Sequence, residues 1–177
     1  MSQFPPGVRA AQVVGLTGAA FLAGNISTYT LSAIPALQSS LSSSPAPSPA
    51  TIARQWLAMY NTGKAQNPPI ALLTASAFSY LAWTAHSGTS AAVDVLSPKN
   101  ATWLYAAAAV VTVGIVPWTL AAMSSVNSTL AGVAEGVGAN AEKRSDEVSE
   151  LLSKWKVLNG VRGVFPFVGA VLGFLAI

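Results

Sequence analysis

The sequence predicts an all-α protein: a four-helix transmembrane bundle with a short interfacial helix in the first loop. The 177 residues are 52% hydrophobic and only 8% charged, whereas soluble domains are about 25% charged. The charges are also unevenly spread, and four long stretches contain none: 10–53, 65–93, 100–134 and 163–177. Because a transmembrane helix needs about 20 such residues, we expect residues 1–177 to form a single integral membrane domain.

The first span is expected at about residues 8–34, closed by Pro35. Its apolar part is longer than the roughly 7–15 residues of a secretory signal, so we expect a retained helix. Polar residues recur along one face of this helix, and Asn25 is the most informative of them. A buried amide needs hydrogen-bond partners, so Asn25 is a candidate either for helix packing or for binding a substrate.

A Ser/Pro/Ala-rich loop over residues 38–50 precedes a short helix that starts near Pro49 and stops at Gly63. This helix carries Trp56 and Tyr60. Tryptophan and tyrosine favour the membrane interface, which indicates an interfacial anchor. The alternative is a lid over a cavity that opens to the bilayer.

The second span is expected at about residues 69–87 and carries His86 at its end. Histidine is the side chain that titrates near neutral pH, so His86 is either a general base or an interfacial hydrogen-bonding residue.

The third span is expected at about 102–126, where Pro117 should bend the helix and free a backbone carbonyl. Thr119 and Asn127 lie on one face of this span, two turns apart.

The fourth span is expected at about residues 155–177. Trp155, Asn159 and Arg162 are spaced i, i+4 and i+7 and therefore share one helical face. A guanidinium at the bilayer centre costs about 2.5–3.5 kcal/mol, so it usually faces the protein interior. We therefore predict that Arg162 points into the bundle, near Asn25 or Asn127.

Composition excludes several classes of protein. There is no cysteine and only one histidine, which argues against thiolate chemistry and against a metal site. A net charge of +3 is too small for nucleic-acid binding.

Most basic residues lie in the first and third loops, which the positive-inside rule assigns to the cytosol. We expect the endoplasmic reticulum or another internal membrane.

The remaining polar residues lie within apolar helices. Such a set is typical of a pocket for a flat, lipophilic molecule that carries oxygens. Three short patterns occur in order along the chain: Trp56, Tyr60 and Gly63; Pro117, Trp118 and Thr119 with Met123 and Asn127; and Lys154, Trp155, Leu158, Asn159, Arg162, Pro166 and Gly169. In these residues and their spacing, the chain resembles the fungal anthrone oxygenase family of small four-helix membrane proteins.

The resemblance implies oxidation of an anthrone to an anthraquinone by molecular oxygen, in aromatic polyketide biosynthesis and without a cofactor. The anthrone loses its methylene proton, the anion reacts with oxygen, and the resulting peroxide loses water. On this basis Arg162 and Asn159 would stabilise the oxyanion. The base would be His86, water, or no residue at all. The substrate-binding residues would be Asn25, Trp56, Tyr60, Thr119, Asn127 and Trp155.

A non-catalytic function is the alternative, either as a membrane scaffold or as a carrier of lipophilic metabolites. Small residues and buried asparagines are sufficient for helix packing alone. The expected partners are a lipophilic aromatic substrate, oxygen and membrane lipid, with no nucleic acid and no metal. The sequence leaves open whether the chain forms a homo-oligomer.

Overall fold

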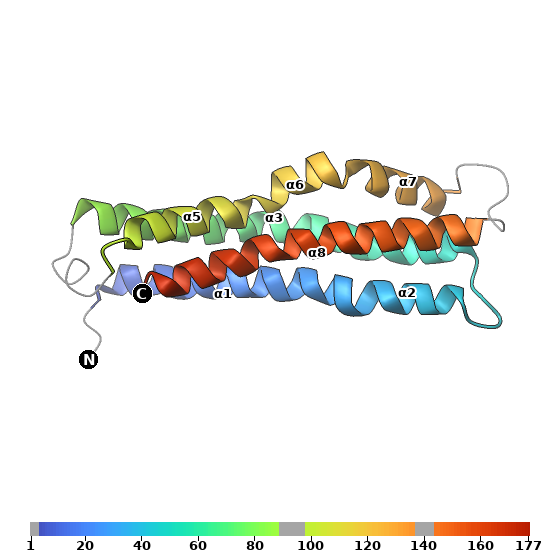
Figure 1. Ribbon diagram of the computed structural model, residues 1–177, viewed down its shortest axis with the longest axis horizontal. Helices are drawn as coiled ribbons and strands as arrows, with labels where there is room; N and C mark the ends of the chain where they lie inside the picture. Colours follow the sequence, from blue (N-terminus) through green and yellow to red (C-terminus); the bar gives the residue numbers. More distant parts are fainter. Residues whose placement is uncertain (1–3, 89–97, 137–143) are drawn as a thin grey trace. The chain divides into compact units, whose positions relative to one another are not determined.

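A computed structural model describes residues 4–88, 98–136 and 144–177, and the regular structure in these ranges is entirely helical (Figure 1). The predicted all-α fold class is thus confirmed. The chain forms two compact units. Unit 1 comprises Met1–Gly24, Asn67–Val116 and Gly163–Ile177, and unit 2 comprises Asn25–Gln66 and Pro117–Arg162.

The N-terminal helical segment is longer than predicted. Helix α1 (Pro6–Thr28) is followed by a π-helical turn, η1 (Tyr29–Ala33), and by α2 (Ile34–Leu41). The predicted end at Pro35 is wrong, because this proline lies in the first turn of α2. Proline is tolerated there, since the first helical N–H groups have no partner within the helix.

Helix α3 (Pro49–Ser87) joins two elements that the sequence analysis separated. The predicted stop at Gly63 is wrong, and the expected interfacial helix is the first part of α3. Gly63 is buried, and a glycine inside a helix costs only about 1 kcal/mol, which packing can offset. Pro68 and Pro69 lie within the same helix and deprive the carbonyls four residues earlier of their usual donors.

The third helical segment is broken twice, into α5 (Ala101–Val113), α6 (Ile115–Ala122) and α7 (Ser124–Ala134). The first break lies at Gly114, next to the Val113 carbonyl, which Pro117 deprives of its usual donor; the bend expected at Pro117 stays a prediction. Helix α8 (Ser145–Leu175) begins before the predicted fourth span. Asp146 and Glu147 occupy its first turn, where the helix dipole favours negative charge.

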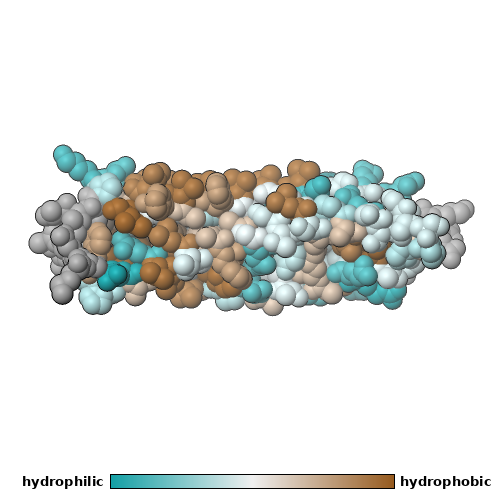
Figure 2. Space-filling view, turned by 90° about the horizontal axis from the view of Figure 1, so that it is seen from below, coloured by the Kyte–Doolittle hydropathy of each residue, from teal (hydrophilic) through white to brown (hydrophobic). Residues whose placement is uncertain are grey.

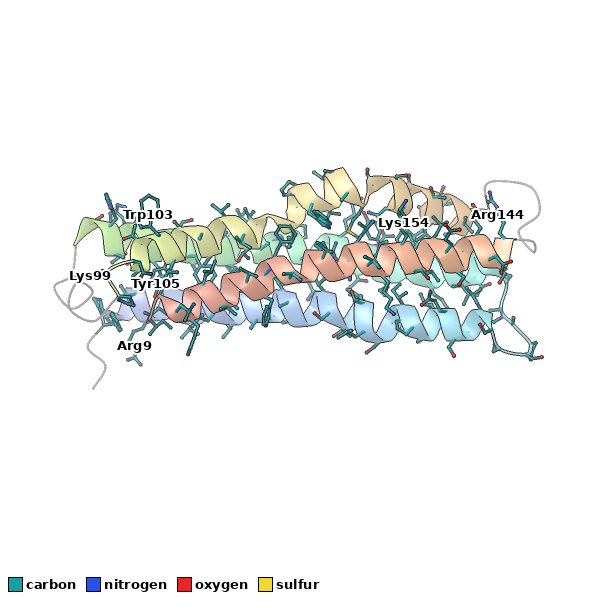
Figure 3. The ribbon with its side chains drawn as sticks, in the orientation of Figure 1. Arg9, Lys99, Trp103, Tyr105, Arg144 and Lys154 are labelled. Carbon is teal, nitrogen blue, oxygen red and sulfur yellow. The ribbon has the colours of Figure 1, made fainter. Side chains whose placement is uncertain are left out.

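The core of unit 1 is built on aromatic rings and close helix contacts. Phe78 of α3 stacks on Tyr105 of α5 at 6.3 Å between ring centroids, and Gln12 of α1 donates to the Tyr105 hydroxyl at 3.3 Å. Figure 3 shows Tyr105 on α5. A side chain at Gly169 would collide with Thr112, so α5 and α8 approach closely because this position is a glycine.

The surface of unit 1 is strongly apolar. Most of the large exposed hydrophobic side chains belong to it, including Trp103 at 78% exposed and Phe174 at 69%, and Figure 2 shows hydrophobic residues gathered over its helices. Exposed apolar patches of this kind mark membrane or protein contacts. Arg9 and Lys99 lie at the end of unit 1 where α1 and α5 begin (Figure 3).

Among the described residues, three helical segments are long and apolar enough to cross a membrane: Pro6–Leu41, Ala101–Ala122 and Ser145–Leu175. The chain is therefore a membrane protein. The predicted span at 69–87 is helical but is not one of the three, because α3 is less apolar. That it crosses the membrane stays a prediction.

The core of unit 2 joins α2, α3, α7 and α8, which lie side by side within this unit (Figure 1). Trp56 and Trp155 are its largest fully buried side chains. The aliphatic residues Ile34, Leu130 and Leu152 pack around them. Two tryptophans of this size contribute much of the apolar burial in unit 2.

The close approach at Gly169 gives a test of packing in unit 1. We expect Gly169→Ala to destabilise the protein by about 1–3 kcal/mol, because the added methyl group meets the buried, stiff side chain of Thr112. The matched control is Gly132→Ala on α7, where nothing lies within 4 Å of the new atom. Thermal unfolding in detergent should show a lower midpoint for the first variant only, and equal midpoints would contradict the packing described.

Candidate functional site

Four side chains in unit 2 form a closed circuit of contacts. Trp56 and Tyr60 come from α3, Asn127 from α7 and Trp155 from α8. The spacing i, i+4 places Trp56 and Tyr60 on one face of α3, and their rings stack at 5.1 Å with an interplanar angle of 10°. Trp155 meets Trp56 edge-on at 6.0 Å and 85°.

Asn127 closes this circuit with two hydrogen bonds. The Trp155 Nε1 donates to the Asn127 Oδ1 at 2.9 Å, and the Asn127 Nδ2 donates to the Tyr60 hydroxyl oxygen at 3.4 Å. An indole N–H can only donate, so the carbonyl oxygen of the amide must face Trp155. The amide orientation is therefore determined by chemistry as well as by geometry.

Arg162 is buried in the same unit, with 8% of its surface exposed. The prediction that it points inward is confirmed, and its Nη1 donates to the Thr119 Oγ1 at 3.4 Å. Tyr29 and Tyr60 lie close enough to act electrostatically on its charge. Within residues 4–88, 98–136 and 144–177, no carboxylate forms an ion pair with Arg162. A buried cation without an anionic neighbour is costly, which indicates a place for an anionic ligand.

Asn159 precedes Arg162 by one turn of α8 and is fully buried. Its Nδ2 donates to the Ile26 carbonyl at 3.0 Å and to the Thr30 Oγ1 at 2.8 Å. These bonds join α8 to the end of α1 and to η1. Asn159 therefore has a structural role in unit 2.

Three buried polar atoms of unit 2 lack a hydrogen-bond partner among the described residues: Trp56 Nε1, Asn159 Oδ1 and Arg162 Nε. Leaving such an atom unsatisfied costs about 1–3 kcal/mol. The set comprises two donors and one acceptor, and one donor is cationic. Such a set suits a ligand that carries both an anionic oxygen and a hydroxyl group.

The remaining predicted site residues are distributed unevenly. Thr119 accepts a hydrogen bond from Arg162. Asn25 is half-buried in the part of α1 that belongs to unit 2. His86 lies in the last turn of α3, is exposed, and belongs to unit 1. The structure thus brings Trp56, Tyr60, Asn127 and Trp155 into one cluster that excludes His86.

Sequence reasoning missed Thr30 and Tyr29. Both lie in the π-helical turn η1. A prediction of helical faces that assumes 3.6 residues per turn does not hold in such a turn. The interaction of Trp118 was also missed: its Nε1 donates to the Leu158 carbonyl at 3.1 Å. Its place beside Pro117 and Thr119 in the sequence pattern was the available signal.

A metal centre finds no support in the described parts of the chain, where no three His, Asp or Glu side chains are grouped to hold an ion. The chemistry available in unit 2 is instead aromatic stacking, a buried cation and amide groups. Groups of these kinds are suited to hold a planar, electron-rich molecule and to stabilise negative charge on an oxygen.

Comparisons with known proteins agree with this chemistry. The family model described as Anthrone oxygenase matches residues 56–172. The chain is 36% identical to Anthrone oxygenase encC of Aspergillus fumigatus over 93% of this chain and 91% of that protein. It is 35% identical to Anthrone oxygenase ptaC of Pestalotiopsis fici, with 70% and 83% covered. Noranthrone monooxygenase of Aspergillus flavus is 32% identical, with 93% and 71% covered. No solved structure matches the chain.

The Asn159 bonds give a stability test of unit 2. We expect Asn159→Leu to destabilise the protein by about 1–3 kcal/mol, because the Ile26 carbonyl and the Thr30 hydroxyl lose a buried donor. Gln38→Ala is the control, because it also removes two hydrogen bonds between α2 and α8, to the Ser149 carbonyl and the Ser153 Oγ, but from a side chain that is only half-buried. Thermal unfolding should separate the two variants, and equal small effects would show that the Asn159 bonds add nothing to stability.

Proposed function

The chain belongs to the anthrone oxygenase family, and we propose that it oxidises an anthrone to an anthraquinone with molecular oxygen in aromatic polyketide biosynthesis. The single observation that supports this activity in the structure is the buried Arg162, which has no carboxylate partner among the described residues. A site of this kind stabilises an oxyanion, and the anthrone becomes an oxyanion when it loses its methylene proton.

The reaction balances as anthrone plus O2 giving anthraquinone plus water. Deprotonation of the methylene carbon places negative charge on the carbonyl oxygen, and the electron-rich anion passes electrons to O2 to form a carbon–peroxide bond. Loss of water from the peroxide leaves the second carbonyl. In this scheme Arg162 holds the oxyanion. The predicted role of Asn159 at the oxyanion does not fit, because its Nδ2 already donates to the Ile26 carbonyl and the Thr30 Oγ1. Its unpartnered Oδ1 instead accepts a hydrogen bond from a hydroxyl group of the substrate.

The aromatic rings of the cluster would hold the tricyclic substrate. Trp56 and Tyr60 are already stacked, and a flat ligand gains about 0.5–1.5 kcal/mol from such a contact beyond its area burial. Asn25 is proposed to orient a further substrate oxygen. A purely structural bundle would be expected to satisfy the three unpartnered polar atoms of unit 2 internally, so these atoms support a binding site over a scaffold.

The proposal includes cofactor independence, because the anthrone anion is itself the electron donor to O2. The proton acceptor is His86, solvent, or none if the substrate arrives ionised.

We also propose that the chain is a single integral membrane domain of the endoplasmic reticulum or another internal membrane. The lipid bilayer would supply the lipophilic substrate.

Activity is tested directly with purified protein in detergent. Given emodin anthrone and oxygen, the protein should raise the quinone absorbance faster than spontaneous oxidation. The rate should be unchanged by a metal chelator, and the purified protein should show no flavin absorbance. Several anthrones with no rate above background would overturn the proposed activity.

Arg162 should be required for the rate. We expect Arg162→Ala to lower kcat/KM by about 10²–10³-fold, the effect of removing one oxyanion donor. Lys154→Ala is the control on the same helix, because Lys154 is exposed. Full activity in Arg162→Ala would remove the assigned role of the buried cation.

A further inference from the structure

The hydroxyl of Tyr60 has an unusual set of neighbours. Its oxygen accepts a hydrogen bond from the Asn127 Nδ2 at 3.4 Å, and the guanidinium of Arg162 lies within electrostatic range. Amide N–H and guanidinium groups donate and do not accept. Neither neighbour can therefore receive the proton of the Tyr60 hydroxyl.

The orientation of the Asn127 side-chain amide is fixed by its hydrogen bond with Trp155. An asparagine amide can normally turn over and exchange its oxygen with its nitrogen. Here the Trp155 N–H occupies the amide oxygen at 2.9 Å in a buried position. A turned amide would place its NH2 group against the indole N–H and leave both buried donors without an acceptor, which is unfavourable.

We infer that Asn127 is a positioning residue, held by Trp155, which leaves the Tyr60 hydroxyl proton free to be donated to an oxygen of the bound substrate. Tyr60 then acts beside Arg162 as a second donor to the oxyanion. This inference rests on the proposed function. It also differs from the sequence-based prediction that Asn127 itself orients substrate oxygens, because both ends of its amide already have protein partners.

The placement of Tyr60 suits this role. Its ring is stacked on Trp56, which limits rotation of the side chain, and it is half-buried in contrast to the fully buried Trp56. In the ranges that the structure describes, no hydrogen bond has the Tyr60 hydroxyl as its donor. A donor that is oriented in advance needs no reorganisation when charge develops on the substrate.

A double-mutant cycle separates this role from a structural one. Tyr60→Phe should lower kcat by about 10²-fold and should weaken binding of the product quinone emodin by only about fivefold, equivalent to one neutral hydrogen bond. Asn127→Leu should also lower kcat, but it should have little further effect in the Tyr60→Phe background. Tyr80→Phe is the control, since Tyr80 lies on α3 in unit 1 and is 41% exposed.

Each outcome decides a separate point. Additive losses in the cycle would show that Asn127 does not act through Tyr60 and would overturn the inference, as would full activity of Tyr60→Phe. If Asn127→Leu does not fold, Trp155→Phe replaces it in the cycle, because it removes the anchoring N–H. If the wild-type protein is inactive, the proposed function fails. Equal affinities of wild type and Tyr60→Phe for emodin would then overturn the inference independently.

Discussion

The buried guanidinium of Arg162, which has no carboxylate partner within residues 4–88, 98–136 and 144–177, is the constraint on which the rest of unit 2 depends. Moving such a charge away from water costs several kcal/mol unless other groups compensate. Among the described residues, Arg162 donates a hydrogen bond to the Thr119 hydroxyl, and Tyr29 and Tyr60 lie within electrostatic range. A protein that keeps this arrangement gives up stability at that point, and strained or unsatisfied groups of this kind are concentrated at functional sites.

The neighbouring contacts explain how the cation is held in place. Asn159 joins α8 to the π-helical turn, and Trp118 joins α6 to α8. The circuit of Trp56, Tyr60, Asn127 and Trp155 joins α3, α7 and α8. Stacked rings and directed hydrogen bonds together leave few alternative arrangements of these side chains, and catalytic groups need this kind of support to keep their geometry.

Much of this arrangement was predictable from the sequence. The i, i+4 and i+7 spacing indicated that Trp155, Asn159 and Arg162 share a face, and the cost of a charge in an apolar layer indicated that Arg162 points inward. The uncharged stretches predicted the helical fold. These signals depend only on composition and helical periodicity, which a single sequence contains.

Other features depend on tertiary packing and were not predictable. The stop expected at Gly63 failed because the cost of a helical glycine is small compared with packing. Thr30 was missed because η1 changes the helical period locally. The double engagement of Asn127 was missed because its partners lie on α3 and α8, far away in the sequence. Pairing between distant segments is visible only once the helices are assembled.

The ionisation state of a bound anthrone tests the central claim most directly. Without oxygen, 1,8-dihydroxyanthrone should bind to the wild-type protein with the absorption spectrum of its anion, because Arg162 supplies the missing counter-charge. Arg162→Met should bind the neutral form. A neutral spectrum with the wild-type protein, or an anionic spectrum with both proteins, would contradict the role of the buried cation.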